Sequence, residues 1–131
     1  TDTAVSRART EKAFKRAMNR MRRRGILAGD FPPEQAALIK EIQAAKKEGD
    51  FARVADLVDQ LAAAVEATRI DAGFIDRKFQ RLAQLTRERK PTGGTKTKVS
   101  SLLRKATRLV GDGKFIMANK ELNRIFALLK R

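Results

Sequence analysis

Apolar residues recur at intervals of three and four along this chain, and every strong periodicity in it is helical. Phe14, Met18 and Met21 show the pattern near the amino end, because residues at i, i+4 and i+7 share one face of an α-helix. We therefore predict an all-α protein with no β-sheet. The expected architecture is a three- to four-helix bundle with a C-terminal helical hairpin.

Glycine and aspartate residues mark the expected helix ends. Gly49 is expected to stop one helix and Asp50 to cap the next, which makes an antiparallel helical hairpin with a two-residue connection. Asp71 is expected to cap a further helix. The helical segments predicted in this way are 3–24, 33–48, 51–69, a segment that begins at Asp71, 99–110 and 115–129.

A change in composition near residue 90 predicts a domain boundary. Residues 90–95 contain one Pro, two Gly and no apolar residue, which is typical of a flexible connection. We predict a basic helical bundle over 1–90, a linker over 91–98 and a helical hairpin over 99–131. The Gly-Gly-Thr-Lys-Thr sequence in the linker is not a phosphate-binding loop, which needs two Gly five residues apart and a Lys directly after the second.

Composition excludes several kinds of site. The sequence has no Cys and no His, so it has no disulfide, no thiolate nucleophile and no imidazole base or metal ligand. Asp56, Asp59 and Glu66 fall on the polar side of a predicted helix, where a solvated face is expected rather than an acid–base site. No apolar run reaches the ~18 residues of a membrane span. We predict no enzyme activity, cofactor, metal ion, membrane partner or small-molecule substrate.

Net charge is the strongest indication of function. Lys and Arg number 30 against 15 Asp and Glu, which gives +15 and an isoelectric point near 11.1. Residues 1–30 and 91–131 carry +6 and +8, whereas 31–70 carry −2 and 71–90 carry +3. Such basicity is typical of nucleic-acid-binding proteins. A merely basic protein, and a membrane-surface helix over 114–131, are the weaker alternatives.

The basic residues of the flanks are the expected phosphate contacts. A stripe at three- and four-residue spacing follows the first predicted helix: Arg9, Lys12, Arg16, Arg20 and Arg23. The adjacent Arg22, Arg23 and Arg24 wrap around this helix, and a guanidinium group matches phosphate oxygens. Tyr and Trp are absent, so recognition by shape and backbone is favoured over base stacking. The predicted nucleic-acid-binding residues are Arg7, Arg9, Lys12, Lys15, Arg16, Arg20, Arg22, Arg23, Arg24, Arg77, Lys78, Arg81, Arg87, Arg89, Lys90, Lys96, Lys98, Arg104, Lys105 and Arg108.

Short motifs in the chain resemble the bacterial-type small-subunit ribosomal protein twenty family. Ser-Arg-Ala-Arg-Thr-Glu-Lys at 6–12 is similar to that family's basic opening, and Ala-Ala-Lys-Lys-Glu-Gly-Asp at 44–50 to its approach to a Gly-Asp turn. Gly73-Phe74-Ile75 matches its Gly-hydrophobic-Ile motif, although Asp-Arg-Lys follows where the family has His-Lys-Asn. The likeness covers about residues 4–24 and 40–90.

The resemblance implies a three-helix bundle that binds small-subunit ribosomal RNA and has a scaffolding role. It implies neighbouring ribosomal proteins as further partners, and a place in the ribosome of a bacterial cytoplasm or an organelle (mitochondrion or plastid). The absent initiator Met allows a cleaved leader. Two alternatives stay open: a helical DNA-binding nucleoid or chromatin protein, which would use the same phosphate contacts, and a helical adaptor for protein–protein assembly.

Overall fold

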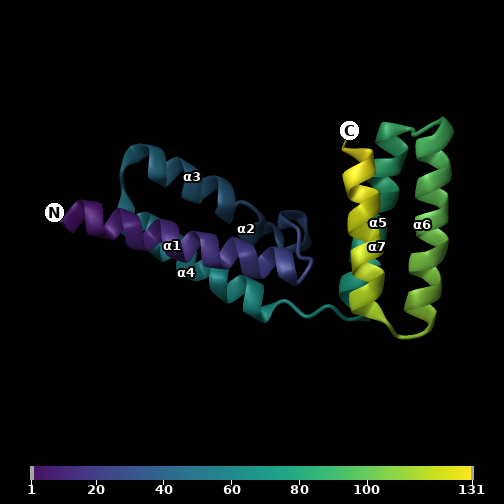
Figure 1. The fold of residues 1–131 in the computed structure, drawn as a ribbon, viewed down its shortest axis with the longest axis horizontal. Coiled ribbons are helices and arrows are strands. Elements are labelled where there is room, and N and C mark those ends of the chain that lie inside the picture. Colours follow the sequence, from purple (N-terminus) through teal and green to yellow (C-terminus); the bar gives the residue numbers. More distant parts are fainter. Residues whose placement is uncertain (1, 131) are drawn as a thin grey trace. The chain divides into compact units, whose positions relative to one another are not determined.

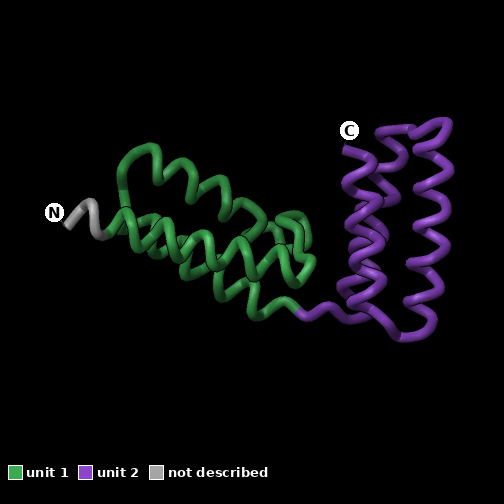
Figure 2. The backbone as a smooth tube through the Cα atoms, viewed as in Figure 1, with its two compact units in different colours: residues 1–68 green, residues 69–131 purple. Residues whose placement is uncertain are grey.

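The computed structural model describes residues 2–130, and the side chains of residues 6–130. The described chain is built from helices and contains no strand, so the predicted all-α class is confirmed. It divides after Thr68 into two compact units, residues 1–68 and 69–131 (Figure 2). The elements are α1 (Asp2–Arg23), the 3-10 helix η1 (Ala28–Asp30), α2 (Pro33–Ala36), α3 (Leu38–Glu48), α4 (Phe51–Ala67), α5 (Ala72–Arg89), α6 (Gly93–Gly111) and α7 (Phe115–Leu129).

Unit 1, residues 1–68, is organised around α4. This helix packs against both α1 and α3 (Figure 1). Val54, Val58, Leu61 and Val65 recur along α4 at helical spacing and are each at most 2% exposed. Helices α1 and α3 and the connection between α1 and α2 contribute further buried side chains to the same core: Ala17, Met21, Ile26, Phe31, Leu38, Ile42 and Ala45.

The hairpin between α3 and α4 forms as predicted. Gly49 ends α3 in the left-handed region at φ +74°, and the Asp50 side chain accepts a hydrogen bond from the Arg53 N–H at 3.2 Å. The predicted helix over 33–48 is wrong in one respect, because it breaks at Ala37 into α2 and α3. The break allows Phe31 and Leu38 both to be buried in the unit 1 core.

Replacing Gly49 with Ala should destabilise unit 1 by about 1–2 kcal/mol, because a Cβ disfavours left-handed backbone. No atom lies within 4 Å of the position a Cβ would take, so the loss comes from conformation and not from a clash. Gly111→Ala is the control, since Gly111 is helical and equally open. Thermal unfolding should show a lower midpoint for the first variant only. Equal midpoints would contradict the assigned turn.

Unit 2, residues 69–131, is organised around α7, which packs against both α5 and α6 (Figure 1). Ala118, Leu122 and Ile125 of α7 are completely buried at helical spacing. Asp71 caps α5 as predicted, since its side chain accepts a hydrogen bond from the Phe74 N–H at 3.0 Å. Phe126 and Leu129 of α7 are buried as well, and α5 and α6 contribute five more buried apolar side chains: Phe74, Ile75, Leu82, Val99 and Ala106.

The domain boundary lies elsewhere than predicted. Residues 91–98 are not a linker, because α6 begins at Gly93, and residues 99–131 are not a separate hairpin, because α7 also packs against α5. The connection from α5 to α6 is completed by Lys90, Pro91 and Thr92, with Lys90 in the left-handed region at φ +46°. Two glycines so close to a proline resemble a linker in composition, yet Gly93 and Gly94 lie in the first turn of α6.

The three-helix bundle that the family resemblance implies differs from the observed arrangement. That bundle would cover residues 4–24 and 40–90, and it would therefore group α5 with the helices of unit 1. In the structure α5 belongs to unit 2 and packs against α7.

Candidate nucleic-acid interface

The first helix carries its basic residues on a solvent-exposed stripe. Arg9, Lys12, Arg16, Arg20 and Arg23 are spaced by three or four residues, so they follow one side of α1, and all five are exposed. The opposite side of α1 faces the core of unit 1. The five residues of the predicted stripe therefore lie together on one exposed side of α1. Three further predicted cations of α1 are also exposed: Arg7, Lys15 and Arg22.

Ion pairs neutralise only part of this stripe. Arg20 pairs with Glu66 of α4 at 3.1 Å, and Arg7 pairs with Glu11 one turn along α1 at 3.2 Å. Exposed pairs such as these contribute little stability. The remaining α1 stripe cations, Arg9, Lys12, Arg16 and Arg23, form no ion pair with any residue that the structure describes.

Arg24 was predicted as a phosphate contact, and the structure gives it a structural role. Its guanidinium donates to the backbone carbonyl of Val65, and to that of Thr68 at 2.6 Å. These carbonyls lie at the C-terminal end of α4, where helix carbonyls lack intrahelical partners and favour a positive charge. Arg24 is half-buried and joins the end of α1 to the end of α4.

Lys78 was also predicted as a phosphate contact, and this prediction is wrong because the residue is only 1% exposed. Its ammonium donates a hydrogen bond to Asn119 Oδ1 on α7 at 2.7 Å. The same Nζ lies 5.3 Å from the ring centre of Phe74 and 5.9 Å from that of Phe126, within cation–π range. Lys78 thus belongs to the core of unit 2. Its neighbour on α5, Arg81, is half-buried over the Phe126 ring.

The junction of α5 and α6 brings several predicted cations together. Arg89, Lys90 and Lys98 line a cavity of about 400 Å³, together with Thr92 and Thr95. The cavity adjoins the amino end of α6, where backbone N–H groups and the helix dipole favour an anion. An anionic group at this junction would meet positive charge from both helices. Two more predicted cations flank the cavity in sequence and are exposed: Arg87 and Lys96.

The last predicted cluster, Arg104, Lys105 and Arg108 on α6, is exposed. Lys105 pairs at 3.4 Å with Glu121 of α7, whose side chain is only 8% exposed. Glu121 also pairs with Arg124 at 3.4 Å.

The sequence prediction did not include the cations of α7 and its approach. Lys114, Lys120, Arg124 and Lys130 are all exposed in unit 2. The spacing of Lys120 and Arg124, one turn apart and off the apolar positions of the helix, was a signal that could have identified them. Together with the α5 and α6 cations they make unit 2 basic on all three helices.

Dividing the charges between the two units separates a nearly balanced unit from a strongly basic one. Unit 1 holds 13 basic and 10 acidic residues, a net charge of +3. Unit 2 holds 17 basic and 5 acidic residues, a net charge of +12. The strongest attraction for a polyanion therefore lies in unit 2, although the terminal segments 1–30 and 91–131 carry comparable charges of +6 and +8.

Other kinds of site find no support in the described residues. No group of three or more potential metal-ligating side chains occurs in that part of the chain. Asp56, Asp59 and Glu66 are exposed along α4, as expected for a solvated face. None of the helices from residue 2 to 130 has the length and apolar content needed to span a membrane.

Comparisons with protein-family models, with curated proteins and with solved structures found no match to this chain. The ribosomal resemblance therefore depends on the short motifs at residues 6–12, 44–50 and 73–75.

Proposed function

We propose that this chain is a structural nucleic-acid-binding protein without enzyme activity, which holds its ligand through phosphate-backbone and shape contacts. The observation that carries the proposal is the net charge of +12 on unit 2, a unit of only three helices. A domain with this excess of Lys and Arg repels itself, and binding a polyanion relieves that repulsion.

The arrangement of the cations favours backbone contacts over base recognition. Most of them lie on exposed faces of regular helices, whereas Phe74 and Phe126 of unit 2 are buried and lie against Lys78 and Arg81. A stacking platform for single-stranded bases needs aromatic rings that are open to the ligand. Folded or duplex nucleic acid, which offers phosphates in a fixed geometry, is the better ligand for such a surface.

We propose RNA of the small ribosomal subunit as the ligand, on the strength of the motif resemblance at residues 6–12, 44–50 and 73–75. Neighbouring ribosomal proteins would then be further partners, in a bacterial or organellar ribosome. Purification of the native protein from its source cells tests this assignment. Cosedimentation with small ribosomal subunits at moderate salt supports it, and cosedimentation with DNA instead would favour the chromatin-protein alternative.

Binding of the purified protein to duplex RNA should weaken steeply as salt is added. If unit 2 neutralises about six phosphates, the logarithm of the association constant should fall against the logarithm of salt with a slope of about −4 to −5. Fluorescence anisotropy between about 50 and 200 mM salt measures the slope. An affinity that does not change over this range would contradict binding by phosphate contacts.

A further inference from the structure

A long groove runs between α1 and α4 of unit 1. Three adjoining cavities of about 430, 330 and 290 Å³ make it up, and neighbouring cavities share lining residues. Ser6 lies opposite Ala52 at one end and Arg20 opposite Glu66 at the other, so α1 and α4 run in parallel. At 1.5 Å per residue the groove is about 20 Å long, enough for four turns of helix.

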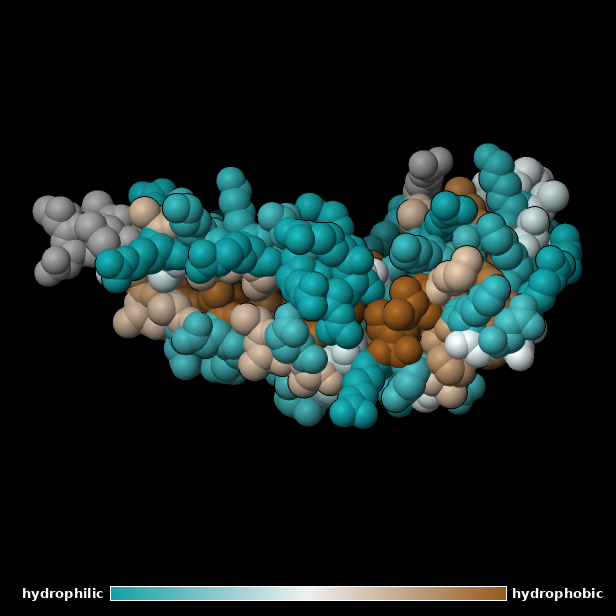
Figure 3. Space-filling model, turned by 60° about the horizontal axis from the view of Figure 1, so that its bottom comes forward, coloured by the Kyte–Doolittle hydropathy of each residue, from teal (hydrophilic) through white to brown (hydrophobic). Residues whose placement is uncertain are grey.

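The floor of the groove is apolar and made of small residues. Half-buried Ala13 of α1 and exposed Ala55 and Ala62 of α4 line it, beside Ala17 and Val58 of the unit 1 core. Figure 3 shows brown and pale brown apolar atoms between hydrophilic side chains on the displayed face of unit 1. Small side chains allow the backbone of another helix to approach closely, so the floor suits a packed helix.

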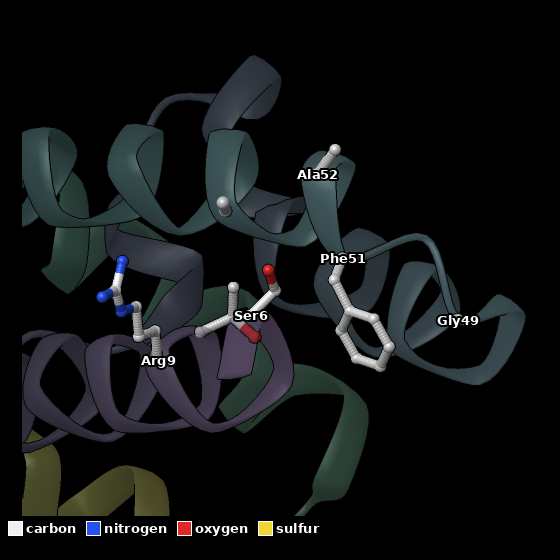
Figure 4. Close-up of a pocket in the computed structure, with 7 residues that line it drawn as sticks. Ser6, Arg9, Gly49, Phe51 and Ala52 are labelled. Atoms are coloured by element: carbon white, nitrogen blue, oxygen red, sulfur yellow. The ribbon is translucent and has the colours of Figure 1, made fainter. Parts of the chain in front are cut away.

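The two walls of the groove carry opposite charges. On the α1 wall, Arg9, Lys12 and Arg16 are exposed and have no ion-pair partner in the described chain. Figure 4 shows Arg9 extending from α1 toward α4. The α4 wall carries exposed Asp59 and Glu66, with Asp56 beside them. The Arg20–Glu66 pair at 3.1 Å shows that charges of the two walls can meet.

We propose that a second copy of this chain docks on the α1–α4 groove and forms a symmetric dimer through unit 1. A two-fold axis along the groove lays α1 of each copy over α4 of the other. Every basic wall then faces an acidic wall, and the two alanine-rich floors pack together. A symmetric interface needs this self-complementarity.

Charge also argues against nucleic acid as the occupant of the groove. Phosphates placed over its floor would be attracted by Arg9 and Arg16 but repelled by Asp59 and Glu66. Unit 1 as a whole carries only +3. A second copy places its acidic α4 wall over the basic α1 wall and its basic α1 wall over the acidic α4 wall. A polyanion offers negative charge to both walls.

Exchanging the charges of the two walls tests the dimer with the full chain and without nucleic acid. One variant carries Arg9→Glu and Arg16→Glu, and the other carries Asp56→Lys and Asp59→Lys. Sedimentation equilibrium at about 0.15 M salt, where screening limits repulsion between the basic units to about 8 Å, reports the mass. The native chain should sediment at about twice its 14.7 kDa, and each variant alone at the monomer mass.

Mixing the two variants is the decisive step. The mixture should regain the dimer mass, because the acidic α1 wall of one variant faces the basic α4 wall of the other. Regained dimer also shows that both variants are folded. A monomeric native chain, a dimer that survives in either variant, or a mixture that stays monomeric would each overturn the proposal.

A binding measurement separates this dimer from the proposed function. Both variants keep every cation of unit 2, so the Asp56/Asp59 variant should bind duplex RNA at least as tightly as the native chain. If the native chain is monomeric and the Arg9/Arg16 variant loses more than 100-fold in RNA affinity, the groove belongs to the nucleic-acid interface and the dimer proposal fails. Dimers that form in a chain without RNA affinity would overturn the proposed function alone.

Discussion

Neutralising five cations at the α5–α6 junction should lower affinity for duplex RNA by on the order of 100- to 1,000-fold near 0.1 M salt. The substitutions to Gln are at Arg87, Arg89, Lys90, Lys96 and Lys98, of which three line the cavity beside the start of α6. Each lost phosphate contact removes the release of about one counterion, so the effects multiply. The slope of affinity against salt should become less steep by about 4. Fluorescence anisotropy over a salt series measures both quantities.

The matched control changes five exposed cations of unit 1 that lie outside the α1–α4 groove to Gln: Lys15, Arg22, Arg23, Lys40 and Lys47. The total charge removed is the same, but these residues share a unit with ten acidic groups. We expect the control variant to lose about tenfold or less. Equal losses in the two variants would mean that the total charge of the chain, and not its concentration in unit 2, determines binding.

Replacing Asn119 with Leu should destabilise unit 2 by about 2–3 kcal/mol, the cost of removing a hydrogen bond to a buried charge. The amide oxygen of Asn119 accepts from the Lys78 ammonium at 2.7 Å, and both residues are 1% exposed. Lys78→Met removes the charge itself and keeps an unbranched apolar chain between the Phe74 and Phe126 rings. The double variant should therefore be more stable than Asn119→Leu alone. Chemical denaturation followed by circular dichroism provides these free energies.

The same Lys78→Met variant tests the revised role of this residue. Because Lys78 is buried, the variant should bind RNA with an affinity within about twofold of the native chain. A loss of RNA affinity as large as that caused by replacing an exposed cation would show that Lys78 contacts the nucleic acid. Additive effects of Asn119→Leu and Lys78→Met on stability would contradict a coupled pair.

Most of the helices could be predicted because the information they need is local. Helical spacing of apolar residues identified α1, α4 and α7 to within about two residues. Gly49, Asp50 and Asp71 marked their helix ends correctly, since a left-handed turn and an N-cap depend on a few neighbouring residues. The exposed stripe on α1 could be predicted for the same reason, because a single helix fixes which of its residues share a face.

Local spacing could not predict which helices pack against each other. The sequence placed α5 with the helices before it, whereas the structure packs α5 against α7. The apolar faces of amphipathic helices of similar length look alike in sequence. Which face packs against which is decided only when the side chains of the whole core fit together. The composition of residues 90–95 then favoured a linker at a position where the fold has a tight connection between two packed helices.

The sequence alone therefore determined the helical class, the helix-capping residues and the excess positive charge, all of which follow from residue type and local spacing. Only the tertiary structure decided which charges are available to a ligand. In the structure Lys78 is buried near two aromatic rings, and Arg24 donates hydrogen bonds to carbonyls at the end of α4. Unit 2 carries +12 of the net charge of +15. The physical reason is that the burial of a side chain and its hydrogen-bond partners depend on contacts between residues about 40 positions apart, such as Lys78 and Asn119. The spacing of residues within one helix does not reveal such contacts.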